Sequence, residues 1–346
     1  MLPLWLLAAF VSSFLLTGLY RQIALRKLLL DIPNERSSHH EPTPRGGGIS
    51  IVVVYLLSLI LLHQQIDLTL AQLLGFVIPG CSLAVVSYID DLGHVKPLWR
   101  LTIQISAASV GIYCLGGIPN TIVSSLSFPV QSVMLVAAVV LLVWIINLYN
   151  FMDGIDGIAS LEAIAVCCGL SFLLWLSWPA SNHFIAPLVL AIAAVGFCCW
   201  NFPKAKIFMG DIGSCFIGLQ LGLFAIYYAN LDINFFWCVI ILLGTFISDA
   251  TVTLVRRFVR GQKIYLAHRE HAYQHLAIKL GSHAPISIAY ALITLLWLLP
   301  IASLVVMMKL HWAIGVAIAY LPLGAAVFVF RAGSPLTRTS QKLKQG

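Results

Sequence analysis

Long apolar runs follow one another along almost the whole of this sequence. Hydrophobic residues fill 60% of the 346 positions and charged residues only 10%, which is unlike a soluble domain. A helix needs roughly 20 apolar residues to cross the hydrocarbon core of a bilayer. Eleven runs approach that length, near residues 2–20, 46–62, 70–89, 101–118, 128–148, 158–178, 184–200, 212–230, 235–255, 286–307 and 312–330. The sequence therefore predicts an all-α polytopic membrane protein with about eleven transmembrane helices.

The distribution of Lys and Arg predicts how these helices are oriented. Basic residues in short loops stay on the cytoplasmic side. With the N-terminus outside, the inside loops hold nineteen of the twenty Lys and Arg, and only Lys309 falls outside. The first run is followed, not preceded, by basic residues, which is the wrong polarity for a cleaved secretory signal. We expect a retained first span, an outside N-terminus and a cytoplasmic C-terminus.

Neither a second domain nor a nucleic-acid partner is indicated. The longest gaps between runs, 21–45 and 256–285, are too short for a soluble domain, so we expect one transmembrane domain over 1–346 with a basic cytoplasmic tail at 331–346. The net charge of +7 follows from the topological bias, with anionic membrane lipid as a secondary partner. The eight cysteines show neither zinc spacing nor a disulfide framework, so we interpret them as small apolar residues.

The few carboxylates are informative, because a charge near hydrocarbon costs free energy. Five of the thirteen acids lie at helix ends that the eleven-span topology places in the cytoplasm. They are Asp90, Asp91, Asp153, Asp156 and Asp211, and the same side holds His268, His271 and His275. Converging carboxylates repel one another unless a cation lies among them, and hard oxygen ligands suit Mg²⁺ together with substrate phosphates. For any single acid, the alternative is a solvated helix end.

Two segments carry most of these acids. NLYNFMDGIDGIAS places Asn147, Asn150, Asp153 and Asp156 three residues apart, which on a helix would keep them on one side. Gly154 and Gly157 would let the backbone unwind or a ligand approach closely, and the alternative is a helix end with turn residues. FMGDIGS around Asp211 leads into a helix whose N-terminal amides favour anions. Together the segments predict a site for a metal and phosphate groups.

Three other features each allow two interpretations. PTPRGGG at 42–48 fits a phosphate cradle with Arg45 as its cation, or a flexible lead into the second run. Lys96 and Arg100 fit attraction of a lipid headgroup, or anchoring on the positive side of the membrane. Asp249, about two turns before Arg256, fits a structural ion-pair partner better than a catalyst.

Taken together, the motifs resemble those of the polyprenyl-phosphate N-acetylhexosamine-1-phosphate transferases. The resemblance covers nearly the whole chain, through DIPNERSSH, PTPRGGG, the Asp90–Asp91 pair with Lys96, Arg100 and Gln104, NLYNFMDGIDG, NFPKAKIFMGDIGS and a His-rich fifth inside loop. It implies eleven helices in the bacterial inner membrane with the active site on the cytoplasmic face. Members of this family transfer a sugar-1-phosphate from a UDP-sugar to undecaprenyl phosphate and release UMP. They require Mg²⁺, for which we expect Mn²⁺ to substitute, and we include a homodimer among the expectations.

The resemblance also implies residue roles. Asp211 would bind the metal together with Asp91, and Asp90 and Asp91 would act near the lipid phosphate. Asn201 and Phe208 would embrace the uridine, Phe208 by stacking. The expected catalytic residues are Asp90, Asp91, Asp153, Asp156 and His271, and the expected substrate contacts are Arg45, Lys96, Arg100, Asn150, Asn201, Phe208, His268 and Arg269.

The histidine motif departs from the family pattern. That pattern reads His-x-His-His, whereas AHREHAYQHL keeps His271 in the first place and has Tyr273 and Gln274 where the others would stand. Because this loop lies near the sugar in the family, the departure bears on the identity of the sugar. The chain resembles the branch that starts O-antigen chains, some of whose members use 6-deoxy-N-acetylhexosamines. We therefore expect the first membrane step of O-antigen or another envelope polysaccharide.

Two other functions fit parts of the sequence. DGIDGIA superficially resembles the CDP-alcohol phosphotransferases, but their motif needs an Ala-Arg pair after the Asp-Gly and two further spaced aspartates, which this sequence lacks. A cation transporter needs polar groups near the bilayer midplane, whereas these acids gather near one surface. The transferase fits the acids best.

Overall fold

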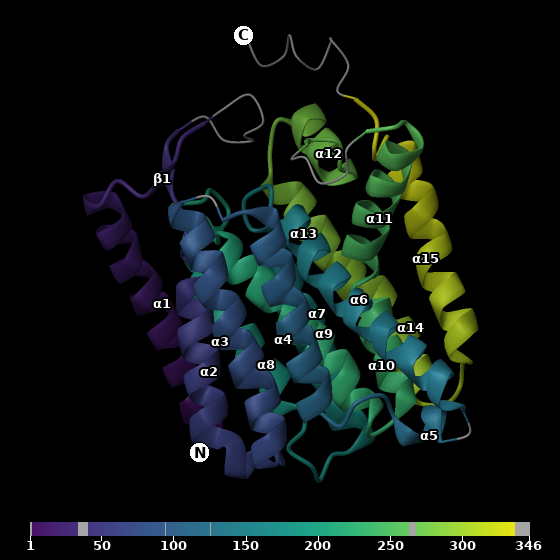
Figure 1. Cartoon of the computed structure of the whole chain (residues 1–346). Coiled ribbons are helices and arrows are strands. Elements are labelled where there is room, and N and C mark those ends of the chain that lie inside the picture. Colours follow the sequence, from purple (N-terminus) through teal and green to yellow (C-terminus); the bar gives the residue numbers. More distant parts are fainter. Residues whose placement is uncertain (1, 34–40, 94, 125, 263–267, 336–346) are drawn as a thin grey trace.

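The computed structural model describes residues 2–33, 41–93, 95–124, 126–262 and 268–335, and it is a bundle of helices (Figure 1). Most of DIPNERSSH and residues 336–346 of the predicted basic tail lie outside these ranges. The helices are α1 (Leu2–Arg26), α2 (Ile49–Leu62), α3 (Leu70–Leu92), α4 (Pro97–Cys114), α5 (Asn120–Val123), α6 (Phe128–Met152), α7 (Ile158–Ser177), α8 (Ile185–Asn201), α9 (Asp211–Ala229), α10 (Ile233–Leu242), α11 (Gly244–Val259), α12 (Ala272–Leu280), α13 (Ala284–Ile293), α14 (Leu299–Val306) and α15 (Trp312–Val329). A 3₁₀ turn, η1 (His63–Gln65), follows α2, and a π-helical segment, η2 (Thr294–Leu298), joins α13 to α14. The only sheet among the described residues is the antiparallel pair β1 (Leu30–Asp31) and β2 (Thr43–Pro44).

The all-α, multi-pass character of the chain is confirmed. Seven described helical segments are long and apolar enough to cross a membrane, and α10 with α11 makes an eighth if that bent pair counts as one span. Helix α8, and α2 together with η1, are apolar but shorter. Each predicted run coincides with a helix or a pair of helices. The count of eleven spans and their orientation stay predictions.

One predicted run is broken. Residues 235–255 were expected to form a single helix, but α10 and α11 meet at an angle of 68° at Leu243–Gly244. Just after the break, the Thr245 hydroxyl donates to the carboxylate of Glu162 on α7, 2.6 Å away. The run therefore changes direction where a polar contact inside the bundle holds it.

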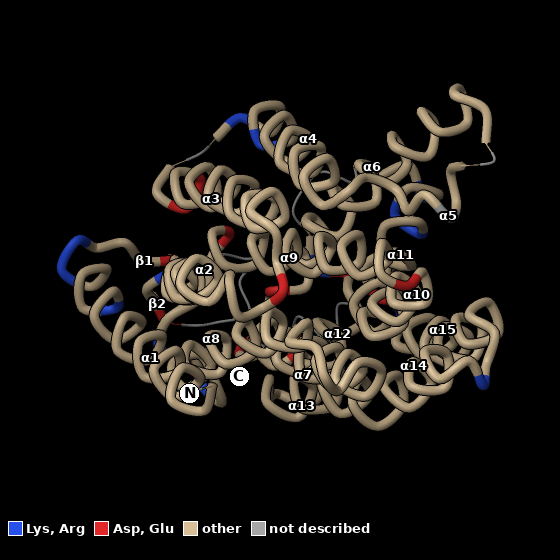
Figure 2. Tube along the Cα trace, turned by 90° about the horizontal axis from the view of Figure 1, so that it is seen from below, with Lys and Arg blue, Asp and Glu red and all other residues tan. Residues whose placement is uncertain are grey.

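Helix α9 lies at the centre of the bundle. Seen along the helices, it is surrounded by other helices, and nearly all of the trace is uncharged (Figure 2). Every residue of α9 after Asp211 is buried. The outer helix α1 instead exposes Leu4, Leu7 and Leu15, as expected for a surface that faces lipid.

Helix direction alternates along the chain, which brings distant segments to one end of the bundle. That end holds β1 and α12, while α5 and the start of α1 lie at the opposite end (Figure 1). Helices α3 and α6 finish at the first end and α9 begins there, since residues at these termini contact one another. The predicted acids therefore meet at a single end of the molecule.

Candidate active site

The site is organised around Asp211, the first residue of α9. Its Oδ1 accepts a hydrogen bond from the Asn150 amide, 2.9 Å away. Its Oδ2 lies 3.1 Å from a guanidinium nitrogen of Arg100, and another nitrogen of Arg100 lies 2.6 Å from Oδ2 of Asp90. Arg100 thus bridges carboxylates from two helices, and groups from α3, α4, α6 and α9 meet within hydrogen-bonding distance.

Asp91 holds the start of α9. Its Oδ1 and Oδ2 accept the backbone N–H groups of Asp211 and Ile212, each at 3.1 Å. The residue before α9 is Gly210, which has a φ of +76° and no side chain to cap the helix; a Cβ there would lie 2.6 Å from Asp91 Oδ2. Asp91 therefore supplies the cap from α3, where a carboxylate also complements the helix dipole. Its predicted metal and phosphate contacts stay predictions.

The segment around PTPRGGG lies against the FMGD loop. The Phe208 N–H donates to the Pro44 carbonyl at 2.8 Å, and the N–H groups of Gly47 and Gly48 donate to the carbonyls of Phe208 and Met209, each at 2.9 Å. Arg45 follows Pro44 and lies near enough for its charge to act on the Asp91 carboxylate. The structure thus brings Arg45 and Phe208 to the site through backbone pairing, and Phe208 is half-buried there.

The DGIDG segment is a turn, not part of a helix. Helix α6 ends at Met152, so the prediction that one helix face carries Asn147 through Asp156 is wrong for the two aspartates. Asn150 reaches Asp211 and Ser214, whereas Asn147 exchanges hydrogen bonds of 2.8 and 3.3 Å with Gln104 on α4. The helix stops because a glycine-rich turn follows it.

The negative charges at this turn act on one another. Burial, followed by the nearby charges of Asp211, Asp91 and Asp156, raises the pKa of Asp153 to about 8. Several carboxylates share one small region, although Arg100 offsets two of them. A divalent cation would lower this repulsion, and the donors are the hard oxygens that Mg²⁺ prefers.

A preformed metal cage is absent from the described part of the chain. No three His, Cys, Asp or Glu side chains there are arranged to hold an ion. Mg²⁺ commonly uses only one or two carboxylates and completes its shell with water and substrate phosphates. The residues present fit that mode, and Asp211 remains the proposed ligand.

The Asn201 side chain joins the DGIDG turn to the loop that precedes α9. Its Oδ1 accepts the Gly157 N–H at 3.0 Å, and its Nδ2 donates to the Ile207 carbonyl at 3.0 Å. The side chain is buried, with these bonds directed into the protein. Its predicted contact with uridine stays a prediction.

Asp249 has a different partner from the one the sequence suggested. The nearby Arg256 donates to the Ala332 carbonyl at 2.7 Å. The fully buried Asp249 carboxylate instead accepts the N–H groups of Ala272 at 2.8 Å and Tyr273 at 3.0 Å, and lies 3.3 Å from Nδ1 of His271. Asp249 is therefore structural, as expected, but it caps α12 and orients His271.

The histidine segment packs as a stack of rings. The rings of His268 and Tyr273 each stack with the His271 ring, with centroids 4.9 and 5.6 Å away. Burial, followed by the charges of His271 and Arg257, lowers the pKa of His268 to about 3, so His268 is neutral at physiological pH. Arg269 is also buried beside this segment. Nε2 of His275 lies 3.0 Å from the Ser334 carbonyl.

Tyr273 stands where the family pattern has histidine, and it ties the histidine segment to the DGIDG turn. Its hydroxyl donates to the Phe151 carbonyl at 3.0 Å, and its ring fills the space beside Gly154, where a Cβ would collide with it. The side chain is fully buried. This departure from the family motif therefore joins two parts of the site.

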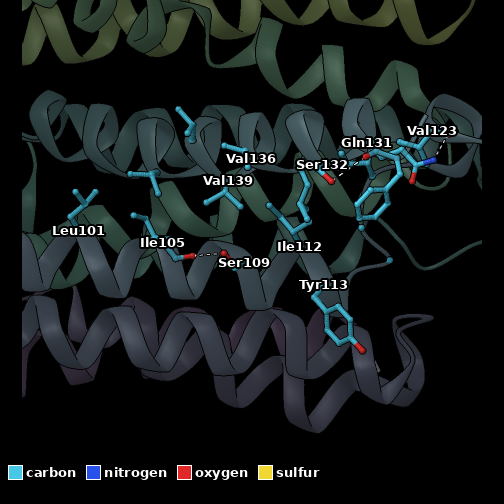
Figure 3. Close-up of a pocket in the computed structure, with 17 residues that line it drawn as sticks. Leu101, Ile105, Ser109, Ile112, Tyr113, Val123, Gln131, Ser132, Val136 and Val139 are labelled. Carbon is cyan, nitrogen blue, oxygen red and sulfur yellow. Dashed lines mark hydrogen bonds between the residues drawn. The ribbon is translucent and has the colours of Figure 1, made fainter. Parts of the chain in front are cut away.

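An apolar groove of about 1110 Å³ leads toward the acids. It runs between α4 and α6, lined mainly by aliphatic residues such as Ile105, Ile112, Val136 and Val139 (Figure 3). Leu101 lines one end of it and follows Arg100 directly in the chain. Lys96, at the start of α4, is exposed at the same end of that helix. A long hydrocarbon chain in the groove would have its polar head beside the charged cluster.

Sequence reasoning missed two acidic contacts. Oδ2 of Asp156 lies 3.2 Å from Nδ1 of His283, which no motif marked. Glu162 is fully buried in α7, and its Oε1 accepts the hydroxyls of Thr245 and Thr294. For Glu162 the sequence did carry a signal, because a carboxylate inside an apolar run costs free energy unless other groups bind it.

The chain is similar to known proteins. Residues 73–229, which include all five acids of the site, match the family model described as Glycosyl transferase family 4. A decaprenyl-phosphate N-acetylglucosaminephosphotransferase of Mycolicibacterium smegmatis is 28% identical over 62% of this chain and 57% of the relative. A probable undecaprenyl-phosphate N-acetylglucosaminyl 1-phosphate transferase of Bacillus subtilis is 26% identical over 78% of this chain and 77% of the relative. A phospho-N-acetylmuramoyl-pentapeptide-transferase of Prochlorococcus marinus is 24% identical over 88% of this chain and 85% of the relative. The region over residues 73–229, with its acids gathered at one end of a helical bundle, matches glycosyl transferase family 4.

Proposed function

We propose that this protein transfers an N-acetylhexosamine-1-phosphate from a UDP-sugar to undecaprenyl phosphate and releases UMP. The observation that carries the proposal is Arg100, which joins Asp90 to Asp211 beside the end of an apolar groove. The groove suits a polyprenyl chain and the charged cluster suits phosphates. The names of the relatives from M. smegmatis and B. subtilis support a polyprenyl phosphate and N-acetylglucosamine.

The proposed reaction is a displacement at phosphorus. An oxygen of the lipid phosphate attacks the sugar-linked phosphorus, the bond from that phosphorus to the bridging oxygen breaks, and UMP leaves with the electron pair. Because the attacking phosphate is already an anion, it needs little deprotonation. The larger barrier is the approach of two anions, so positioning and neutralisation contribute most of the rate.

The residues take roles that follow from their places. Arg100 and Lys96 attract the lipid phosphate at the end of the groove, and Asp90 orients it or accepts its proton. Asp91 holds the start of α9, which places Asp211. Asn150 orients the Asp211 carboxylate, and the DGIDG turn lines the nucleotide side.

Asp211 would hold a Mg²⁺ ion, or Mn²⁺ in its place, and such an ion would supply positive charge beside the pyrophosphate. Asp91, Asp153 and Asp156 stand near enough in the acidic cluster for their charges to act on one another. We place the site on the cytoplasmic face of the bacterial inner membrane, where a soluble UDP-sugar is found, and the positive-inside distribution supports that orientation. The predicted homodimer stays a prediction.

The finer part of the proposal concerns the sugar and the pathway. We infer that the donor is a UDP-N-acetylhexosamine, that a 6-deoxy sugar is a candidate, and that the product begins O-antigen or another envelope polysaccharide. The support is the altered histidine motif, in which the buried Tyr273 and Gln274 replace histidines.

A panel assay tests the proposal. Purified protein receives Mg²⁺, undecaprenyl phosphate and, one at a time, UDP-N-acetylglucosamine, UDP-N-acetylgalactosamine and their 6-deoxy analogues. UMP release that requires the lipid phosphate supports the transferase, and the fastest donor identifies the sugar. Failure of every donor to release UMP, with protein shown to be folded, would refute it.

A further inference from the structure

Four polar residues recur on one face of α13 and its continuation into η2. They are His283, Ser287, Tyr290 and Thr294, spaced by four, three and four residues. That spacing aligns side chains along one side of a helix. Ser287 and Thr294 are fully buried, and Tyr290 is nearly so. In an apolar helix such a row is costly unless each member binds a partner inside the protein.

Each member does bind a partner, and the partners belong to the site or its supports. The upper two hold the DGIDG turn: His283 Nδ1 lies 3.2 Å from Asp156 Oδ2, and the Ser287 hydroxyl donates to the Asp156 carbonyl at 2.7 Å. Further along, the Tyr290 hydroxyl donates to Asp249 Oδ2 at 2.7 Å. Thr294 donates to Glu162 on α7 at 3.0 Å.

Asp249 links Tyr290 to the histidine segment. Its carboxylate accepts the first N–H groups of α12 and lies against the imidazole of His271. The Tyr290 hydroxyl therefore binds the group that orients His271. One helix face thus contacts both the turn that carries Asp156 and the support of His271.

We propose that α13 is a positioning element of the active site, with His283 and Tyr290 as positioning residues that set the DGIDG turn and the His271 segment relative to one another. The expected change in kcat/KM rests on the proposed function, whereas the expected change in the structure of the His271 segment does not. Neither residue needs to touch substrate. His283 acts through Asp156, and Tyr290 acts through Asp249.

The kinetic test compares two tyrosine variants that each lose one hydrogen-bonded hydroxyl. Tyr290→Phe removes the bond to Asp249, whereas the control Tyr320→Phe removes a 2.6 Å bond to the Ile240 carbonyl, on α15 and away from the acids. A lost hydrogen bond to a charged group corresponds to about a tenfold change. We expect Tyr290→Phe to lower kcat/KM for the UDP-sugar about tenfold and to leave KM for the lipid phosphate unchanged. Tyr320→Phe should leave kcat/KM for the UDP-sugar and KM for the lipid phosphate unchanged, even if its thermal unfolding midpoint falls as much as that of Tyr290→Phe.

Rescue by a conservative variant tests His283. Nδ1 of His283 accepts the Asp156 N–H at 3.4 Å and lies 3.2 Å from Asp156 Oδ2. The side-chain amide of His283→Asn places a polar atom close to that position, and its oxygen can accept this N–H, so this variant should keep most of the activity that His283→Ala loses. Equal loss in both variants, or wild-type kcat/KM for the UDP-sugar in Tyr290→Phe and His283→Ala, would overturn the proposal.

Hydrogen exchange measures the positioning directly and needs no turnover. Amides over residues 268–280 should exchange faster in Tyr290→Phe than in wild type and remain protected in Tyr320→Phe, because the Ala272 and Tyr273 N–H groups bind Asp249. Unchanged protection in Tyr290→Phe would overturn the inference. An inactive wild-type protein with this exchange pattern would refute the proposed function alone.

Discussion

Arg100 joins Asp90 to Asp211, so replacing it with glutamine changes the charge at the centre of the proposed site. The variant leaves two facing carboxylates without their shared cation, and an incoming lipid phosphate meets a more negative surface. Glutamine is shorter and neutral, so it cannot bridge both acids. The variant should still fold, because the helices around it are held by many other contacts.

The size of the effect follows from the two ion pairs. Their distances are 2.6 and 3.1 Å, and the three side chains are between 10% and 30% exposed. A hydrogen bond to a charged group contributes about 1.5–3 kcal/mol, and partial exposure places each of these near the lower end. Loss of both, about 3 kcal/mol, corresponds to roughly a hundredfold fall in kcat/KM.

The assay is lipid-dependent UMP release with each substrate varied in turn. KM for undecaprenyl phosphate should rise more than KM for the UDP-sugar, since Arg100 lies beside the groove. Arg256→Gln is the matched control, because that half-buried arginine binds the Ala332 carbonyl and the Phe328 ring, away from the acids. Activity of Arg100→Gln within threefold of wild type would refute the reasoning.

Four further variants test other parts of the site. Asp211→Asn should abolish turnover in folded protein, and a normal rate with Mg²⁺ would remove the metal assignment. Asp91→Asn weakens the cap of α9, so the free energy of unfolding should fall by about 1 kcal/mol and activity should fall too; unchanged thermal unfolding would contradict that role. Ile105→Trp narrows the groove and should raise KM for undecaprenyl phosphate but not for a short-chain analogue, and equal effects on both would argue against a tail site. His271→Ala should lower kcat/KM for the UDP-sugar, and full activity would exclude His271 from the sugar site.

The sequence predicts most of this fold because hydrocarbon leaves few choices. Apolar runs of the right length become helices, and each of the eleven runs lies in one or in a pair. The break at Leu243–Gly244 was not predictable from hydropathy, because the two halves taken together are apolar enough for a single span. It coincides with the contact between Thr245 and Glu162, which is a property of packing.

Which residues gather at the site was partly predictable, because the order of the helices fixes which helix ends lie together. Alternating helices bring every second terminus to the same end, so Asp90, Asp91 and Asp211 had to approach one another. Which oxygen binds which donor was not predictable. Spacing along the chain does not show that Asp91 accepts backbone N–H groups, or that Arg100 lies between two acids.

The histidine segment shows the limit most clearly. Motif comparison treats Tyr273 as a missing histidine, whereas the structure uses its ring and hydroxyl to join α12 to the DGIDG turn. Asp249 likewise has its partner 22 residues along the chain at His271, and not at the nearby Arg256. Such pairs form because a buried carboxylate must find donors wherever the fold provides them.

The fate of the β-phosphorus of the donor tests the proposed chemistry most directly. The purified protein is given UDP-N-acetylhexosamine labelled at that phosphorus, together with undecaprenyl phosphate and Mg²⁺, and the lipid and aqueous products are separated. Sugar-1-phosphate transfer places the label in the lipid and leaves unlabelled UMP in the water. Label recovered as UDP, with the sugar alone on the lipid, would contradict the displacement at phosphorus.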